Sequence, residues 1–218
     1  MPNIYANTED GSILSIDASG WSGARDATAG NGDFSSNAFW INAVMARKAR
    51  GTRYAVNRAF FSFDKSGISV TPSEATLKIY GLTNDTADFF VVKANHGGTL
   101  ENADIDAIVG WSNSGVDNEG NVTKYSSEFD ASASWSTSGY NNITLNATAL
   151  THMADKDDFK ICLIESVHDL RNVEPSDGTA YLTGLYYSDW VGTGRDPYID
   201  YTVATAATDN ATFFGCNF

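Results

Sequence analysis

The chain has 218 residues, a length at which an all-β sandwich commonly forms one domain, and 42% of its residues are hydrophobic and 12% aromatic, enough to build a core of its own. Acidic residues outnumber basic ones by 27 to 14, and the formal net charge of −13 repels phosphate backbones and anionic membrane surfaces. We therefore expect neither nucleic acid nor a membrane as a partner, although an acidic excess also serves solubility alone.

The first residues carry no basic segment followed by an apolar stretch, and no apolar run reaches the ~20 residues that span a bilayer. We expect a protein that is made and kept in a cytoplasm unless an assembly carries it out.

Short strands are predicted along most of the chain, because apolar and polar residues alternate in segments bounded by Gly, Asn, Asp or Ser. In chain order the predicted strands are 13–16, 39–44, 59–63, 75–80, 89–94, 142–145, 159–164, 180–187 and 198–203.

The alternation also predicts which side chains face inward. Segment 75–80 places Leu77 and Ile79 on one face, and segment 198–203 places Ile199, Tyr201 and Val203 on one face. Segment 159–164 is apolar on both sides, which indicates a central strand covered on both faces.

Helical signal is confined to two short segments. Asn146 is placed to cap a helix over 147–153, because its side-chain oxygen can accept from the free backbone donors of a first turn. Segment 102–109 predicts a second short helix. The predicted fold is therefore an antiparallel β-sandwich over residues 1–203 with one or two short connecting helices, followed by a C-terminal arm over 204–218.

Three stretches of the chain are similar to a known family. They are RAFFSFD at 58–64 with the later SEATLKIY at 73–80, NITLNATAL at 142–150 with the apolar strand that follows it, and RDPYIDY at 195–201. On these residues the chain from Arg58 to Val203 resembles the DNRLRE-type jelly-roll domain, a relative of carbohydrate-binding modules. Tyr198 and Ile199 depart in detail from the closing strand of that family.

The resemblance implies a jelly-roll β-sandwich and supports the fold more than the function. Such domains occur in secreted carbohydrate-active proteins, cell-surface adhesins and bacteriophage virions. The leading hypothesis is a structural protein of a bacteriophage virion, as a head decoration, head fibre or tail component, which forms a homotrimer and contacts other virion proteins. The alternatives are a carbohydrate-binding module or adhesin tip, and a polysaccharide hydrolase or lyase.

Residues of catalytic type form no recognisable constellation in the sequence. The three histidines, His96, His152 and His168, lack metal-ligand spacing, and no Gly-x-Ser-x-Gly motif marks a serine nucleophile. Acidic residues group at 104/106, 117/119 and 155/157/158, all in predicted loops, where solvated acids are ordinary. We predict no catalytic residue and no cofactor.

The two cysteines, Cys162 and Cys216, lie far apart in different contexts, so no disulfide framework is implied. Cys162 falls in a predicted central strand, where a thiol behaves as a small hydrophobic group. Segment 117–121 alternates oxygen-bearing side chains around a glycine and is faintly similar to a calcium loop, but it lacks the bidentate acid at the twelfth position.

Tryptophans in predicted loops are candidate sugar-stacking residues, because a planar ring can lie against a pyranose. Trp21 and Trp190 are the main candidates, and Trp111 and Trp135 also fall in possible loops; the alternative is that each ring caps the core. Phe213, Phe214 and Phe218 follow a small polar stretch and are predicted to dock, either on a neighbouring copy or particle or back on their own core.

Overall fold

The protein is an all-β sandwich, as its alternating sequence predicts. The computed structural model describes residues 2–33, 37–51, 53–155 and 158–203. Its eleven strands join in the order β1-β11-β6-β10-β4-β5-β2-β3, with β8 on β6 and β9 between β5 and β7. The pairing of these strands is antiparallel throughout.

The element bounds in the described residues are these. The strands are β1 (Asn3–Tyr5), β2 (Gly11–Asp17), β3 (Gly32–Asp33), β4 (Phe39–Lys48), β5 (Tyr54–Phe63), β6 (Glu74–Asp85), β7 (Phe89–Lys93), β8 (Tyr140–Thr144), β9 (Phe159–Glu165), β10 (Ala180–Tyr186) and β11 (Tyr198–Thr202). The helical elements are α1 (Trp21–Arg25), α2 (Ala131–Ser134), α3 (Ala147–Met153), the 3-10 helix η1 (Asn102–Asp106) and the π-helix η2 (Ser166–Leu170).

The first core lies between the layer of β11, β6 and β8 and the layer of β5, β9 and β7. Alternate residues of β6 point into it, and Leu77 and Ile79 are fully buried there. Phe61, Ile161 and Tyr201 reach the same core from β5, β9 and β11. The inward faces predicted for these strands are confirmed, except that Val203 follows the end of β11 and is exposed.

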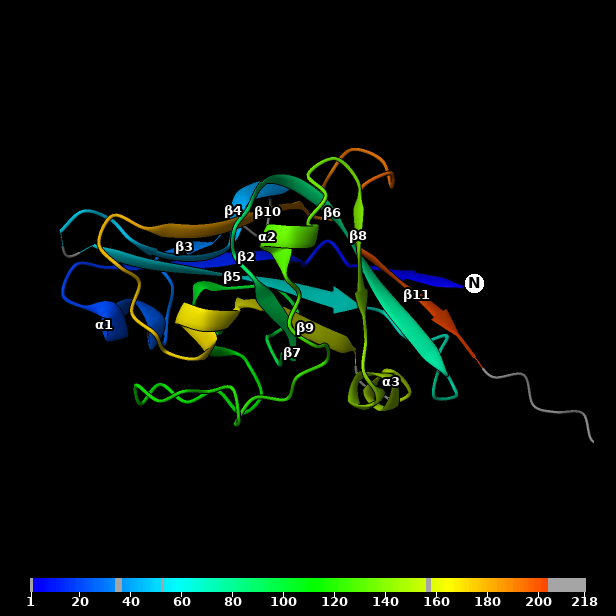
Figure 1. Cartoon of the computed structure of the whole chain (residues 1–218). Coiled ribbons are helices and arrows are strands. Elements are labelled where there is room, and N and C mark those ends of the chain that lie inside the picture. Colours follow the sequence, from blue (N-terminus) through cyan, green and yellow to red (C-terminus); the bar gives the residue numbers. More distant parts are fainter. Residues whose placement is uncertain (1, 34–36, 52, 156–157, 204–218) are drawn as a thin grey trace, which may run out of the picture.

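A second apolar core lies on the other side of β5 and β9. Phe60, Cys162 and Ile164 enter it from these strands, and α1, η1 and the long connection after β7 cover it. Figure 1 shows this connection, in green, below the sheet. β9 is therefore covered on both faces, as its apolar sequence predicts, and burial raises the pKa of the Cys162 thiol well above its usual value.

The cap predicted for the helix after β8 is present, because the Asn146 side chain accepts from the backbone N–H of Ala149 at 3.1 Å. η1 is a single 3-10 element, shorter than the predicted segment. The sequence pattern missed α1, α2, η2 and the short strands β1 and β3. The predicted arm over 204–218, with Phe213, Phe214, Cys216 and Phe218, lies outside the described residues.

Strand β10 is flanked by irregularities on both sides. Between Thr183 and Leu185 its register shifts against both β4 and β6. Over this interval β4 and β6 each contain more residues than β10 does. Gly184 lies at this point, and a side chain there would collide with the carbonyl oxygens of Thr83 and Ile41. Beyond the shift, Leu185 points into the first core while Tyr186 points outward.

Candidate functional site: an outward aromatic face

A continuous group of aromatic rings covers the outer side of the sheet formed by β1, β11, β6, β8, β10 and β4. We call it the aromatic face; its members are Tyr5, Phe39, Tyr80, Tyr140, Tyr186, Trp190 and Tyr198.

Strand register brings these rings together. Tyr5 lies directly opposite Tyr198, Tyr80 opposite Tyr140, and Tyr186 opposite Phe39. Residues opposite each other in antiparallel strands share a face, and here it is the face turned away from the first core. The ring centroids of successive members lie between 4.8 and 5.5 Å apart along the path Tyr5, Tyr198, Tyr140, Tyr80, Tyr186 and Trp190.

Trp190 and Arg195 come from the connection between β10 and β11, the orange loop beside β8 in Figure 1. The guanidinium carbon of Arg195 lies 4.5 Å from the ring centre of Tyr186, 4.8 Å from that of Trp190 and 5.1 Å from that of Tyr80. Such cation–π contacts fix Arg195 over the face. Within the described residues Arg195 forms no ion pair, so its N–H groups are available to a ligand.

The two ends of the aromatic face are the most accessible. Tyr5 is 44% exposed at one end and Phe39 is 43% exposed at the other, whereas Tyr186 in the middle is covered by its neighbours. Beside Phe39 and the exposed Ile41 lies a hollow of about 410 Å³, lined by residues 37–42. One end therefore offers both an exposed ring and a concave surface.

Polar side chains interleave with the rings on the same side of the sheet. Lys78 donates to the Asn142 side-chain oxygen at 2.7 Å and lies 3.6 Å from the Asp200 carboxylate. The Tyr140 hydroxyl donates to the Asp196 backbone oxygen at 3.1 Å, which ties the connection after β10 to β8. Rings for stacking and groups that donate or accept hydrogen bonds thus share one surface.

The two tryptophans predicted to stack on sugars have different surroundings. Trp190 is half-buried in a loop, as predicted, and is part of the aromatic face. The loop predicted for Trp21 is wrong, since Trp21 begins α1 and packs on Tyr54 in the second core with only 7% of its surface exposed. Its indole N–H donates to the Asn172 side chain at 2.9 Å, and the burial of the ring leaves no face for a sugar.

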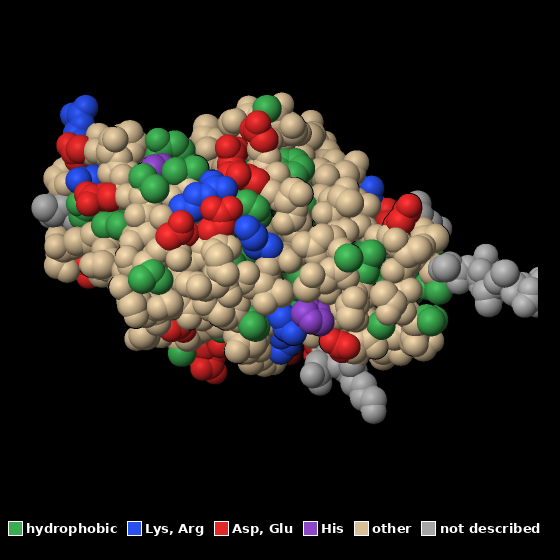
Figure 2. Space-filling model, turned by 60° about the horizontal axis from the view of Figure 1, so that its bottom comes forward, with side chains coloured by type: hydrophobic (Ala, Val, Ile, Leu, Met, Phe, Trp, Pro, Cys, Tyr) green, Lys and Arg blue, Asp and Glu red, His purple; other side chains and the backbone are tan. Residues whose placement is uncertain are grey.

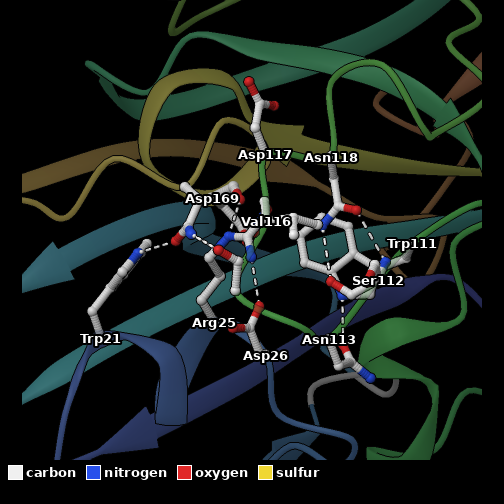
Figure 3. A network of polar contacts seen from close by, with 12 residues as sticks. Trp21, Arg25, Asp26, Trp111, Ser112, Asn113, Val116, Asp117, Asn118 and Asp169 are labelled. Atoms are coloured by element: carbon white, nitrogen blue, oxygen red, sulfur yellow. Dashed lines mark hydrogen bonds and ion pairs between the residues drawn. The ribbon is translucent and has the colours of Figure 1, made fainter.

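Trp111 and Trp135 also pack inward, as the alternative for these rings proposed. Trp135 contacts Phe89 and Phe129 in the first core. Trp111 covers a buried polar network that includes Arg25 and Asp169 (Figure 3). The guanidinium carbons of Arg25 and Arg58 lie 4.6 and 4.0 Å from the centre of its ring. These contacts hold the long connection after β7 on the second core.

The acidic segment 117–121 is used for structure. Asp117 accepts the backbone N–H of Glu119 at 2.8 Å, and Asn118 makes two 3.0 Å hydrogen bonds to the backbone of Ser112. The Glu119 carboxylate pairs with Arg171 and Lys124, on the loop-covered side where Figure 2 shows red and blue side chains beside one another. The described residues contain no group of His, Cys, Asp and Glu that could hold a metal ion, so the faint calcium pattern has no geometric support.

The histidines occupy three separate places. His152 and His96 line a cavity of about 400 Å³ at the ends of β7 and β9, together with Tyr125 and Lys160. The His152 Nδ1 atom lies 2.8 Å from the Tyr125 hydroxyl, and burial with the nearby Lys160 charge lowers the pKa of His96 to about 4. The His168 ring contacts the Tyr181 ring at a tilted angle, and its Nδ1 is 2.6 Å from the Val173 oxygen.

No protein-family model matches the chain, and no curated protein matches it. The resemblance of the chain to the DNRLRE-type domain therefore stays a prediction. Among the described residues, no helix is both long and apolar enough to cross a membrane.

Sequence reasoning found one member of the aromatic face, Trp190, and missed the others. Alternation does place Tyr80 outward, since its neighbours Leu77 and Ile79 point in. Alternation does not give the strand register, which places Tyr5 opposite Tyr198 although the two residues lie near opposite ends of the described chain. Aromatic residues at the outward positions of several predicted strands were the signal from which this face could have been predicted.

Proposed function

We propose that this chain is a non-enzymatic structural protein of a bacteriophage virion whose sandwich displays a polysaccharide-binding surface, the aromatic face. The observation that carries the binding role is the run of contacting rings from Tyr5 to Trp190, with Arg195 over its centre. A protein has no packing need for so many rings on the outer side of a sheet, and contiguous apolar surface of this kind marks interaction sites.

A glycan fits this surface better than an apolar partner does. Aromatic rings offer flat surfaces to the C–H side of a sugar, while Arg195, Asn142 and Asp200 beside them can donate to or accept from its hydroxyl groups. Across the paired strands β1, β11, β6, β10 and β4, with neighbours ~4.8 Å apart, the face runs for about 20 Å. That length suits a chain of several sugars.

The virion setting rests on the sequence resemblance and on the acidic charge of −13. In this setting the sandwich is a building block, repeated as a homotrimer, and its aromatic face meets glycans on the bacterial surface. A secreted carbohydrate-binding module or adhesin tip would use the same face. A virion protein and a secreted protein would therefore differ in the assembly that carries the sandwich and not in its binding surface.

Binding is tested by electrophoresis of the folded protein in gels that contain hydroxyethylcellulose, dextran or bacterial lipopolysaccharide. We expect retardation by at least one of these polymers, and Trp190→Ala and Phe39→Ala should each weaken it about tenfold or more. Val173→Ala is the matched control, because Val173 is 49% exposed and lies beside His168, away from the aromatic face. Equal retardation of all three variants and the wild type would refute the aromatic face as the binding surface.

The virion setting is tested separately. Mass spectrometry of purified phage particles from the source should detect the chain, and sedimentation of the isolated protein should give a trimer. Detection of the chain only as a free monomer in cells that contain particles would refute the virion role and leave the binding role to the gel assay.

A further inference from the structure

The loop that carries Trp190 and Arg195 is fastened to the body of the protein at one place by a buried acid. Asp10 lies just before β2 and is fully buried. Its Oδ2 atom accepts the backbone N–H of Ser188 at 2.9 Å, and its Oδ1 atom lies 2.8 Å from the Ser188 hydroxyl oxygen. The same hydroxyl oxygen lies 2.8 Å from the backbone oxygen of Asn7.

A count of hydrogens shows that this arrangement needs one more proton than an ionised Asp10 supplies. A serine hydroxyl has a single hydrogen to donate. With Asp10 ionised, Ser188 faces two acceptors, and one of its two 2.8 Å contacts is then a repulsive contact between oxygen lone pairs. With Asp10 protonated on Oδ1, Asp10 donates to Ser188 and Ser188 donates to Asn7, and every contact is a hydrogen bond.

The charges around Asp10 favour the same proton. Burial raises the pKa of Asp10 to about 7, and the charges of Asp189 and Asp196, both carboxylates from the same loop, act in the same direction. Tyr187, the other titratable neighbour, stays neutral because burial raises the pKa of its phenol well above the usual value. The pKa values of Asp189 and Asp196 are also raised, chiefly by burial.

We propose that Asp10 is a positioning residue that carries a proton in the folded protein and, as the neutral acid, holds the loop that places Trp190 and Arg195 on the aromatic face, so that ligand binding weakens as Asp10 ionises. The binding half of this proposal rests on the proposed function of the aromatic face. The loop is most firmly held at acidic pH and loosens as the pH rises toward neutral.

The proton itself is tested on the wild-type protein. Carbon NMR of the aspartate carboxyl carbons, followed from pH 3 to pH 9, should show the Asp10 signal titrating near neutral pH, whereas the pKa of the exposed Asp64 is lowered by its hydrogen bonds with Ser66. An Asp10 carboxyl that titrates below pH 5 would overturn the proposal.

The hold on the loop is tested by hydrogen exchange of the amides in 187–197, compared between wild type and Asp10→Asn at each pH. An asparagine retains an oxygen for the Ser188 amide and supplies an N–H toward the Ser188 hydroxyl, so it mimics the protonated acid and does not titrate. Relative to this variant, exchange in the wild type should rise at least tenfold between pH 5 and pH 7 and level off above, because ionisation favours the opened loop across that window. A constant ratio would overturn the proposal.

Glu165→Gln is the matched control. Glu165 is also buried, burial raises its pKa to about 7 as well, and it lies near Thr179 and Tyr181 at the far end of β10. This variant should leave the pH dependence of exchange in 187–197 as in wild type. If it removes that dependence, the effect comes from global stability and the Asp10 assignment is wrong.

The binding half uses the same three polysaccharides as probes. Retardation that weakens from pH 5 to pH 8 in wild type, and stays constant in Asp10→Asn, supports it; retardation that is independent of pH in both refutes it. If no polymer retards the protein at any pH, the proposed function of the aromatic face fails, and the carboxyl titration and the exchange ratio still decide the role of Asp10.

Discussion

Arg58 and Asp169 form a two-pronged ion pair inside the second core, with Arg58 Nε 2.8 Å from Asp169 Oδ2 and Nη2 2.7 Å from Oδ1. Both side chains are completely buried. The remaining guanidinium N–H groups donate to the backbone oxygens of Ile105 and Arg25. One strand residue thus fastens η2, η1 and α1 to β5.

Removal of one partner leaves a buried charge alone, so Asp169→Ala should lower the free energy of unfolding by ~3–5 kcal/mol. Urea denaturation measures this. Glu128→Ala, which removes one of the partly exposed partners of Arg171, should change the same quantity by less than ~1 kcal/mol. Equal losses in the two variants would show that the buried pair is no more important than a surface pair.

The first core should be sensitive to truncation at its centre. Ile161 is fully buried and packs in the first core, so Ile161→Ala should cost ~2–5 kcal/mol through lost apolar burial and an unfilled cavity. Thermal unfolding is the measurement. Val173→Ala, at a position 49% exposed, serves as the control and should leave the melting temperature nearly unchanged.

Two buried acids should make the protein more stable in mild acid than at neutral pH. Burial raises the pKa of both Asp10 and Glu165 to about 7, whereas an unfolded acid titrates near its ordinary value. Between these values the folded protein binds more protons than the unfolded chain, so the free energy of unfolding increases as the pH falls from 7 toward 5.

The contribution of Asp10 to this change is at most ~4 kcal/mol, since its shift spans about 3 pKa units. Urea denaturation at pH 5 and pH 8 should show a smaller difference for Asp10→Asn than for wild type. A wild-type protein that gains stability from pH 5 to pH 8 would contradict the raised values.

The predicted arm is tested by deletion of residues 210–218. If the arm docks on a neighbouring copy or on the particle, the truncated protein should unfold at nearly the same temperature as the full chain and fail to form the oligomer. Calorimetry and sedimentation measure these two properties. A lower unfolding temperature of the truncated monomer would show that Phe213, Phe214 and Phe218 belong to its own core.

Local patterns in the sequence predicted the parts of the fold that depend on neighbours along the chain. Alternation placed Leu77 and Ile199 inward, and the Asn146 cap follows from side-chain chemistry within one turn. Trp21 was misplaced because the glycines and serine around it are typical of a loop, while packing on Tyr54 from a distant strand stabilises a helix there.

The site depends on relationships that no local pattern contains. Tyr186 and Phe39 share a face because β10 pairs with β4, and Asp10 meets Ser188 because β2 begins beside the end of β10. A charged residue at position 58 inside an apolar strand was a visible signal of a buried partner, but nothing in the sequence identified Asp169 as that partner.

The register shifts on both sides of Gly184 bear on the kind of polymer that the proposed binding surface would hold. Bulges bend a strand and increase its twist, and here the pairing of β10 with both β4 and β6 shifts just before Tyr186, the ring that contacts Phe39 and Tyr80. We therefore expect the rings at the two ends of the aromatic face to be tilted relative to each other. If the aromatic face binds a glycan as proposed, a planar crystalline fibre would touch only one end at a time, whereas a single solvated strand of sugars could curve to follow both.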